Sequence, residues 1–418
     1  MNNHMLLPEK PVQEISMSTL NEIAEHYVRL TLAVGEHDPG YIDAYTGPAE
    51  WQQQVRQASL SDLLATATEL QQAIATMSAP PAEEAERRVY LEKHIASVAT
   101  YIRQLQGHFL PFDEESAALY DAVSPALTPE DLDATLAQLD KQVPGHGDLN
   151  QRLSAYNRQF EIPSAKLDAV FQAAVAESRA RTLANIPLPE NESFHIAYVN
   201  NQVWSAYNWY KGNAYSLIEV NTDFPMFIAR AIDLASHEAY PGHHVFNLLI
   251  EQDLVQQKQW MEYAVYPLYS PASFLAEGSA NYGIEVAFPR AERLQFEKEV
   301  LFPLAGIAPE LAEDYYAIQD TLQALSYAGN MVAKDYLDGR IGKTEAVAML
   351  MKYSLSDQQR SEQRLRFIEK NRSYVINYNL GQDVVKAWVE QQAGDNPQRR
   401  WDVFADLLRR PKTASMMR

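Results

Sequence analysis

The chain has 418 residues, with 35 basic and 55 acidic side chains and a formal net charge of −20. This acidic balance argues against a nucleic-acid backbone or an anionic membrane as the main partner, because charges of one sign repel. Cysteine is absent, which excludes disulfides, a cysteine nucleophile and thiolate-ligated metals, so any metal must be held by His, Asp or Glu.

The N-terminal stretch MNNHMLLPEKPVQEIS has neither a basic start nor a long apolar run, so we expect no signal peptide. No apolar stretch of about 18 residues occurs in the chain, and we expect no membrane span. These features favour a cytoplasmic protein, although an exported protein whose leader has been removed would show the same sequence. No pattern in the chain indicates an oligomeric state.

Helical periodicity dominates residues 15–185. Apolar side chains recur at helical spacing in stretches such as LNEIAEHYVRLTLAVG and SAKLDAVFQAAVAESRARTLA. One stretch in this region, GEHDPGYIDAYTGPAEW at 35–51, is rich in Gly, Pro and aromatic residues and predicts an ordered loop. We therefore interpret 1–185 as an N-terminal helical region.

A short sheet is predicted next. Two prolines in NIPLPENES (185–193) end the helical pattern, and FHIAYV, VWSAYNWY and YSLIEVNT then predict about three antiparallel strands. The last of these could offer an edge to an extended peptide. Helix returns at 224 and continues to the end, so we expect a mostly α protein with one small antiparallel sheet before the active-site helix. Region 186–418 carries the site, and the two regions form one continuous domain or two lobes around a cleft.

The stretch HEAYPGHH (237–244) begins as a zinc-hydrolase motif does. In H-E-x-x-H, two histidines one helical turn apart bind zinc, and the glutamate beside the first is the general base. His237 and Glu238 fit this first half. The second histidine is replaced by Pro241, and two histidines follow late, at His243 and His244.

The spacing is compatible with a metal only if the helix breaks. On a straight helix either late histidine would lie about 9–10.5 Å along the axis from His237. Pro241 cannot donate to the carbonyl of His237, and Gly242 adds backbone freedom, so the helix must bulge or break here. Such a break can bring His243 or His244 back to a shared metal.

A third ligand is expected on a separate helix, in SFLAEGSANYGIEVAF. Glu277 lies among small residues that would let two helices approach closely, as a shared metal requires. Glu285, two turns further on, is a candidate for an outer acid. The donor set of histidine and glutamate suits Zn²⁺.

The motifs HEAYPGHH and AEGSANYGIE resemble the bacterial DUF885 family, whose members carry H-E-x-x-P-G-H-H. The likeness extends to YKGNAYSLIEVNTDFP and FIEKNRSYVINYNLGQDVV and is strongest over about 190–390. The family looks related to the gluzincin metallopeptidases, which implies a helical metallopeptidase-like fold. It also implies zinc ligands at His237, His243 and Glu277, with Glu238 as the base. Ser279 stands where the family usually has Trp, which would enlarge or repolarise a pocket beside Glu277.

A peptidase also needs donors for the oxyanion that forms at the scissile carbonyl. In RSYVINYNLG, Tyr374 and Tyr378 are four residues apart and share a helical face, so one could donate, although such pairs also form cores. Arg372 could hold a substrate carboxylate with two hydrogen bonds. His244 is a candidate outer group or oxyanion donor, and Tyr327 is a weaker candidate.

These patterns predict a zinc-dependent hydrolase, most simply a metallopeptidase in which Glu238 takes a proton from water. The expected substrate is a peptide or a small amide. Two alternatives fit the same residues: a helical protein that binds metal without catalysis, and a zinc amidohydrolase acting on a non-peptide amide.

Overall fold

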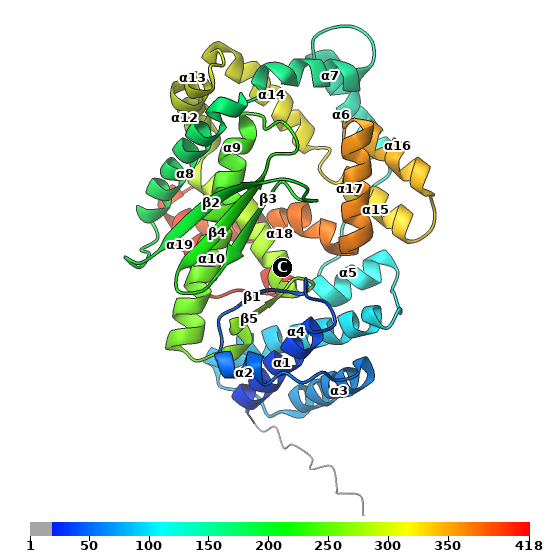
Figure 1. Ribbon diagram of the computed structural model, residues 1–418, viewed down its shortest axis with the longest axis vertical. Helices are drawn as coiled ribbons and strands as arrows, with labels where there is room; N and C mark the ends of the chain where they lie inside the picture. Colours follow the sequence, from blue (N-terminus) through cyan, green and yellow to red (C-terminus); the bar gives the residue numbers. More distant parts are fainter. Residues whose placement is uncertain (1–18) are drawn as a thin grey trace, which may run out of the picture.

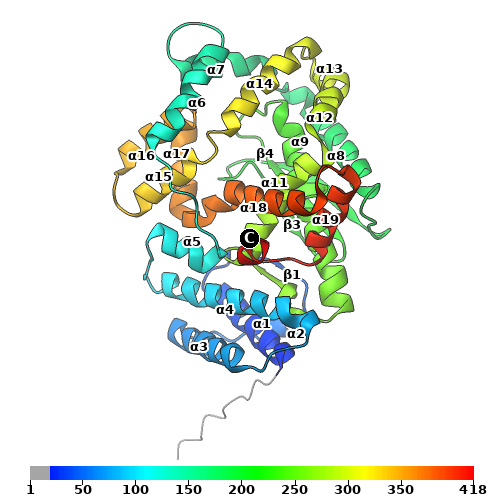
Figure 2. The ribbon, with the colours of Figure 1, turned by 180° about the vertical axis from the view of Figure 1, so that it is seen from behind.

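The computed structural model describes residues 19–418 and is mostly α-helical, as the sequence predicts (Figures 1 and 2). The N-terminal stretch in which we expect no signal peptide lies outside the described residues. None of the helices within 19–418 is long and apolar enough to cross a membrane.

The N-terminal helices begin and end at ordinary sequence signals. A capping box, in which the side chains of Thr19 and Glu22 each accept from the other residue's backbone N–H, starts the first helix. Pro129 opens the sixth helix at a position where no N–H is needed. The helices of this region are α1 Leu20–Gly35, α2 Ala49–Gln53, α3 Leu60–Thr76, α4 Ala85–Leu105, α5 Phe112–Tyr120, α6 Pro129–Gln142, α7 Leu149–Asn157 and α8 Leu167–Leu183.

The second region starts with a three-stranded sheet and continues as helices. Its strands are β2 Ser193–Val199, β3 Ala206–Tyr210 and β4 Tyr215–Asn221. The helices are α9 Ala229–Leu234, α10 His243–Leu249, α11 Pro271–Ala287, α12 Arg290–Phe296, α13 Phe302–Ala305, α14 Ala312–Gln323, α15 Ala328–Leu337, α16 Lys343–Tyr353, α17 Gln358–Asn371, α18 Ile376–Ala393 and α19 Pro397–Arg409.

The small sheet is present where the sequence predicts it, with a topology that the sequence does not reveal. Its strand order is β2–β4–β3. The β3–β4 pair is antiparallel, as expected, whereas β2 runs parallel to β4. The predicted edge role of YSLIEVNT is wrong, because β4 is the central strand and β3 forms the edge.

The stretch at 35–51 contains more regular structure than the predicted loop. Its residues Ile42–Tyr45 form strand β1, which pairs with β5, Val265–Pro267, in an antiparallel two-stranded sheet. The register shifts between Ile42 and Ala44, so Asp43 lies at a bulge. A bulge re-aims a side chain, and this one places Asp43 in the cleft described below.

Two large hydrophobic cores hold these elements together. One joins the N-terminal helices to α15–α18, and the other joins the sheet to α8–α11 and α18–α19. Each core takes residues from both 1–185 and 186–418. This sharing favours the interpretation of the two regions as one continuous domain.

Helices α11 and α18 pack unusually closely across the middle of the molecule (Figure 2). A Cβ atom on Gly278 of α11 would lie 2.4 Å from the backbone carbonyl of Gly381 on α18. No side chain fits there, so glycine is required at the contact. The tight contact of Gly278 is therefore with the helix that follows Tyr374, whereas the sequence predicts a close approach to the segment that carries His237. That segment meets α11 at Gly283, where a Cβ atom would lie 3.1 Å from the ring of Pro241.

Candidate metal centre

The HEAYPGHH segment contains the predicted helix break. Helix α9 continues into a π-helical turn, Ala235–Ala239, and Tyr240 is extended before α10 begins at His243. Inside the break, the N–H of Gly242 donates to the carbonyl of Ser236 at 2.9 Å. A Cβ atom on Gly242 would lie 1.8 Å from the carbonyl oxygen of His237, so only glycine permits this turn.

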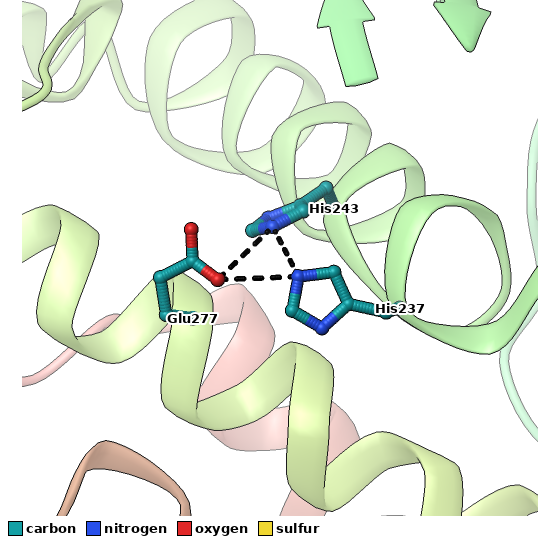
Figure 3. Close-up of side chains that lie close together, drawn as sticks. All are labelled: His237, His243 and Glu277. Atoms are coloured by element: carbon teal, nitrogen blue, oxygen red, sulfur yellow. Dashed lines mark hydrogen bonds and ion pairs between the residues drawn. The ribbon is translucent and has the colours of Figure 1, made fainter. Parts of the chain in front are cut away.

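The break brings His243 back to His237, and α11 supplies Glu277 opposite them (Figure 3). The Nε2 atoms of the two histidines are 3.1 Å apart. Oε2 of Glu277 lies 3.1 Å from Nε2 of His237 and 3.7 Å from Nε2 of His243. Ligand atoms at about 2.0–2.1 Å from a tetrahedral zinc lie roughly 3.3 Å from one another. The three atoms therefore match one face of such a tetrahedron, and the group could hold a metal ion.

The two oxygens of Glu277 have different surroundings. Oε1 accepts a hydrogen bond of 2.7 Å from the hydroxyl of Tyr374. Oε2, which faces the histidines, is buried without a hydrogen-bond partner among the described residues. A buried carboxylate oxygen without a donor is costly, and a cation in the group would satisfy it.

Asn281 fixes the orientation of His237, a role that the sequence analysis missed. Nδ1 of His237 lies 2.8 Å from the side-chain oxygen of Asn281, and the amide nitrogen of Asn281 donates to the carbonyl of Tyr378 at 2.8 Å. This second bond assigns the amide, so Nδ1 of His237 donates and Nε2 keeps its lone pair for a metal. The signal was available, since Asn281 lies one helical turn after Glu277.

We expect Asn281→Ala to weaken zinc binding by about 10–100-fold, because His237 loses the acceptor that sets its tautomer. Competition against a chromophoric chelator measures the affinity. Glu285→Gln is the matched control: Glu285 lies on the same helix and lines the same cleft, but bonds to Lys386 and Gln382 instead. Equal affinities for the two variants would contradict the assigned role.

Glu238 lies at the wall of the cleft beside the metal group. Its side chain is 5% exposed, and its carboxylate makes no hydrogen bond or ion pair within residues 19–418. Burial raises the pKa of the Glu238 carboxyl above its usual range, and the neighbouring His237 and His243 oppose this rise. A carboxylate held in this way is a stronger base than an exposed glutamate.

The remaining charges of the group are strongly coupled. Burial alone would lower the pKa of His243, but Glu277, Glu238 and Asp43 raise it to about 9. Burial opposes ionisation of Glu277, yet the two histidines hold its pKa below the usual range. Asp43 has its pKa raised to about 6, chiefly by burial. The carboxylates of Glu277, Glu238 and Asp43 therefore all favour positive charge at His243, and they would favour a bound cation for the same reason.

The metal group opens into a cleft of about 1180 Å³. Residues of strand β3, of α17 and of the start of α18 line it, and α17 lies to the right of β3 in Figure 1. The lining includes several aromatic side chains, among them Trp204, Tyr207, Trp209, Phe227, Tyr266, Phe367, Tyr374 and Tyr378. Tyr207 donates to Asp43, a pairing across distant segments that the sequence analysis also missed.

Tyr374 and Tyr378 lie together in the cleft, as their spacing predicts, with ring centroids 5.7 Å apart. Burial, followed by the charge of Glu277, raises the pKa of both phenols well above the usual range. Both therefore keep their protons and can donate. Because Tyr374 already donates to Glu277, Tyr378 is the phenol available to a ligand.

His244 does not reach the metal group, and its predicted role as an outer group or oxyanion donor is wrong. Its side chain is 0% exposed. Nδ1 lies 2.8 Å from the hydroxyl of Ser216 on β4, and Nε2 lies 3.2 Å from Oε2 of Glu192. Since adjacent residues on a helix point about 100° apart, α10 directs His243 to the cleft and His244 to the sheet.

Arg372 lies outside the cleft lining, so the predicted grip on a substrate carboxylate is wrong for this residue. It stands at the C-terminal end of α17 with a left-handed φ of 51°. Its guanidinium donates to Glu115 at 2.7 Å and stacks over Phe109. The positive φ turns the side chain away from the direction that helical spacing would give it.

Three further expectations are corrected by the positions of the side chains. Glu285 lines the cleft but pairs with Lys386 at 2.6 Å, so it is not an outer acid of the metal group. Tyr327 lies outside the cleft lining and donates to Asp383. Ser279 is buried, donates to the carbonyl of Ala276 and lies outside the cleft lining, so it does not shape the pocket.

No family model and no curated protein matches the chain. The fold is similar to that of a solved structure described as "the putative lipoprotein from Colwellia psychrerythraea". The likeness has a TM-score of 0.52 and 14% sequence identity, and covers 97% of this chain and 76% of that one. At this identity it shows the fold alone.

Proposed function

We propose that the protein is a zinc-dependent hydrolase that cleaves peptide bonds, related to the DUF885 proteins and through them to the gluzincin metallopeptidases. One observation carries the proposal: His237, His243 and Glu277 offer three ligand atoms within 4.8 Å of one another, at the wall of a large cleft. A structural metal site is closed and uses four protein ligands, whereas a catalytic zinc keeps a position open. Three ligands facing a cleft therefore favour catalysis.

Zinc held by this group would lower the pKa of a water molecule and polarise the scissile carbonyl. Glu238 takes the proton of the attacking water and passes it to the leaving amine. Tyr378 donates to the oxyanion that develops on the carbonyl. Tyr374 and Asn281 hold Glu277 and His237 in position.

The shape of the cleft favours a peptide over a small amide. Its volume of about 1180 Å³ exceeds the roughly 300–1000 Å³ of small-molecule sites. Strand β3 lies at the wall as an edge of its sheet, and an edge strand can pair with an extended peptide backbone. The aromatic side chains of the cleft lining offer apolar contacts to the residues of a substrate.

We expect the purified protein to contain about one zinc per chain and to cleave members of a fluorogenic peptide library. Chelation should abolish cleavage and added zinc should restore it, because the water and carbonyl depend on the ion. Mass spectrometry gives the metal content. His237→Ala should lose both zinc and cleavage, whereas His195→Ala, an exposed histidine on β2, should keep both.

Two results would favour the alternatives instead. Stoichiometric zinc without cleavage of any peptide or amide supports a metal-binding protein without catalysis. Zinc-dependent cleavage confined to non-peptide amides supports an amidohydrolase.

We also propose a cytoplasmic location, as the sequence predicts. The lipoprotein description of the similar structure belongs to that protein, and it makes export the alternative to test. Fractionation of bacterial cells that produce the chain separates the two: recovery with the membrane or periplasmic fraction contradicts a cytoplasmic location.

A further inference from the structure

Helix α17 presents a row of basic and aromatic side chains to the cleft. Arg360, Arg364 and Phe367 line it and recur at i, i+4 and i+7, so they share one face of the helix. Figure 1 shows α17 to the right of β3, and both elements contribute residues to the cleft lining. In a chain of net charge −20, basic groups turned inward from this wall require an explanation.

Most arginines of the cleft already have an acidic partner. Arg293 pairs with Asp233 at 2.9 Å, and Arg290 pairs with Asp320 at 2.9 Å. Arg360 lies 4.0 Å from Asp357 and stacks over the rings of Phe224 and Phe227. These guanidiniums hold protein segments together and are occupied by those contacts.

Arg364 differs from them. Within residues 19–418, its side chain makes no hydrogen bond and no ion pair. Its guanidinium carbon lies 5.1 Å from the ring centroid of Phe367, which supports one face and leaves the N–H edge unused. Burial lowers the pKa of this guanidinium below its usual value. The Arg364 side chain is partly buried, and an anion bound at its free N–H edge would stabilise a cation that has lost part of its contact with water.

Arg364 lines the same cleft as the metal group. Its charge acts on Tyr378, and Tyr378 in turn feels the charges of Glu277 and Glu238. The ring of Tyr378 is 6.2 Å from that of Phe367, the support of Arg364. Tyr378 is therefore close enough to Arg364 and to Glu277 for the charges of both to act on it.

We infer that Arg364 binds a carboxylate of the substrate, and that it thereby determines which peptides are cleaved. A guanidinium presents a planar fork of N–H groups that matches a carboxylate with two hydrogen bonds. The carboxylate is a free C-terminus or an acidic side chain close to the scissile bond. The inference rests on the proposed function for its effect on cleavage, but it also predicts binding without cleavage.

Three peptides of one core sequence test the effect on cleavage: a free acid, its C-terminal amide, and an amide carrying Asp beside the cleaved bond. We expect the wild type to prefer one carboxylate-bearing peptide to the plain amide by about 100-fold in kcat/KM, and Arg364→Gln to lose that preference. Preference for the free acid identifies the C-terminus as the source, and preference for the Asp peptide identifies a side chain. Equal rates for all three, or a preference that survives Arg364→Gln, would overturn the inference.

Two variants separate recognition from general damage. Arg366→Gln alters an exposed arginine of the same helix and should keep the wild-type preference. Arg364→Lys keeps the positive charge but lacks the planar fork of N–H groups, so it should recover only part of the wild-type preference. In Arg364→Gln, kcat/KM should fall more for the preferred carboxylate-bearing peptide than for the plain amide; an equal loss for all three peptides would indicate a structural role only and would overturn the inference.

Binding gives a readout that does not depend on the proposed function. Calorimetry on the zinc-loaded Glu238→Gln variant compares N-acetyl-glycylglycine with its amide, and N-acetyl-aspartate amide with N-acetyl-asparagine amide. In at least one pair the carboxylate should bind about tenfold or more tighter, and adding Arg364→Gln should remove the difference. Equal affinity within both pairs would overturn the inference even if peptides are cleaved.

Discussion

Replacing Glu238 by Gln should leave zinc bound and reduce kcat on the order of 1000-fold. Glu238 is not one of the three grouped ligands, so its loss leaves the metal donors intact. It is a buried carboxylate at the cleft wall whose pKa is raised by burial, and glutamine has nearly the same volume but no basic site. KM should change little, because the lost interaction acts in the transition state.

The measurement pairs metal analysis with steady-state kinetics on one preparation. Glu285→Gln is the matched control, since Glu285 also lines the cleft but pairs with Lys386; it should retain both zinc and turnover. Loss of zinc from Glu238→Gln would mean that Glu238 is a ligand, and full turnover would remove it as the base.

The metal group is where the sequence is most informative. Pro241 and Gly242 act locally, within a few residues of His237, so elementary backbone rules predict that the helix breaks and that a late histidine can return. Glu277 follows from the small residues around it, which predict a close helix contact. The choice of His243 over His244 depends on how α10 faces the sheet, and only the resemblance to a family favoured His243.

The predictions that the structure contradicts depend on contacts between segments that are distant in sequence. Arg372 and Tyr374 are neighbours in sequence, but a left-handed φ of 51° at Arg372 points one side chain to Glu115 and leaves the other in the cleft. Asp43 enters the cleft because β1 pairs with β5, more than 200 residues away. A four-residue strand inside a loop rich in Gly and Pro carries too little periodicity to be predicted.

The fold class was predictable because the sequence signal for a helix is local. Long runs of 3.6-residue periodicity specify helices almost without tertiary context, and the mostly α prediction is confirmed. Strand partners are not specified in this way. Three short strands can pair in several orders, and the parallel pairing of β2 with β4 depends on the crossover between them, which periodicity does not encode.

The two adjacent histidines should give opposite phenotypes. His243→Ala removes a proposed ligand, so zinc affinity should fall by more than the roughly 10–100-fold caused by loss of an outer partner, and cleavage should vanish. The fold should survive, because the side chain of His243 lies at the cleft and is 12% exposed. His244→Ala should instead keep the zinc site and lower the free energy of unfolding by about 3 kcal/mol, because it leaves a cavity and removes a partner of Glu192 and Ser216.

Zinc titration of each variant, started from the zinc-free protein, measures its metal affinity. Urea denaturation of the zinc-free variants measures the free energy of unfolding. His244→Gln is a milder companion that keeps a polar group beside Glu192 and should lose less stability than His244→Ala. Unfolding must be compared without zinc, because a bound metal stabilises the folded state by mass action and would hide the difference. Weakened zinc binding in a folded His244→Ala protein, with normal binding in His243→Ala, would reverse the assignment and make His244 the ligand.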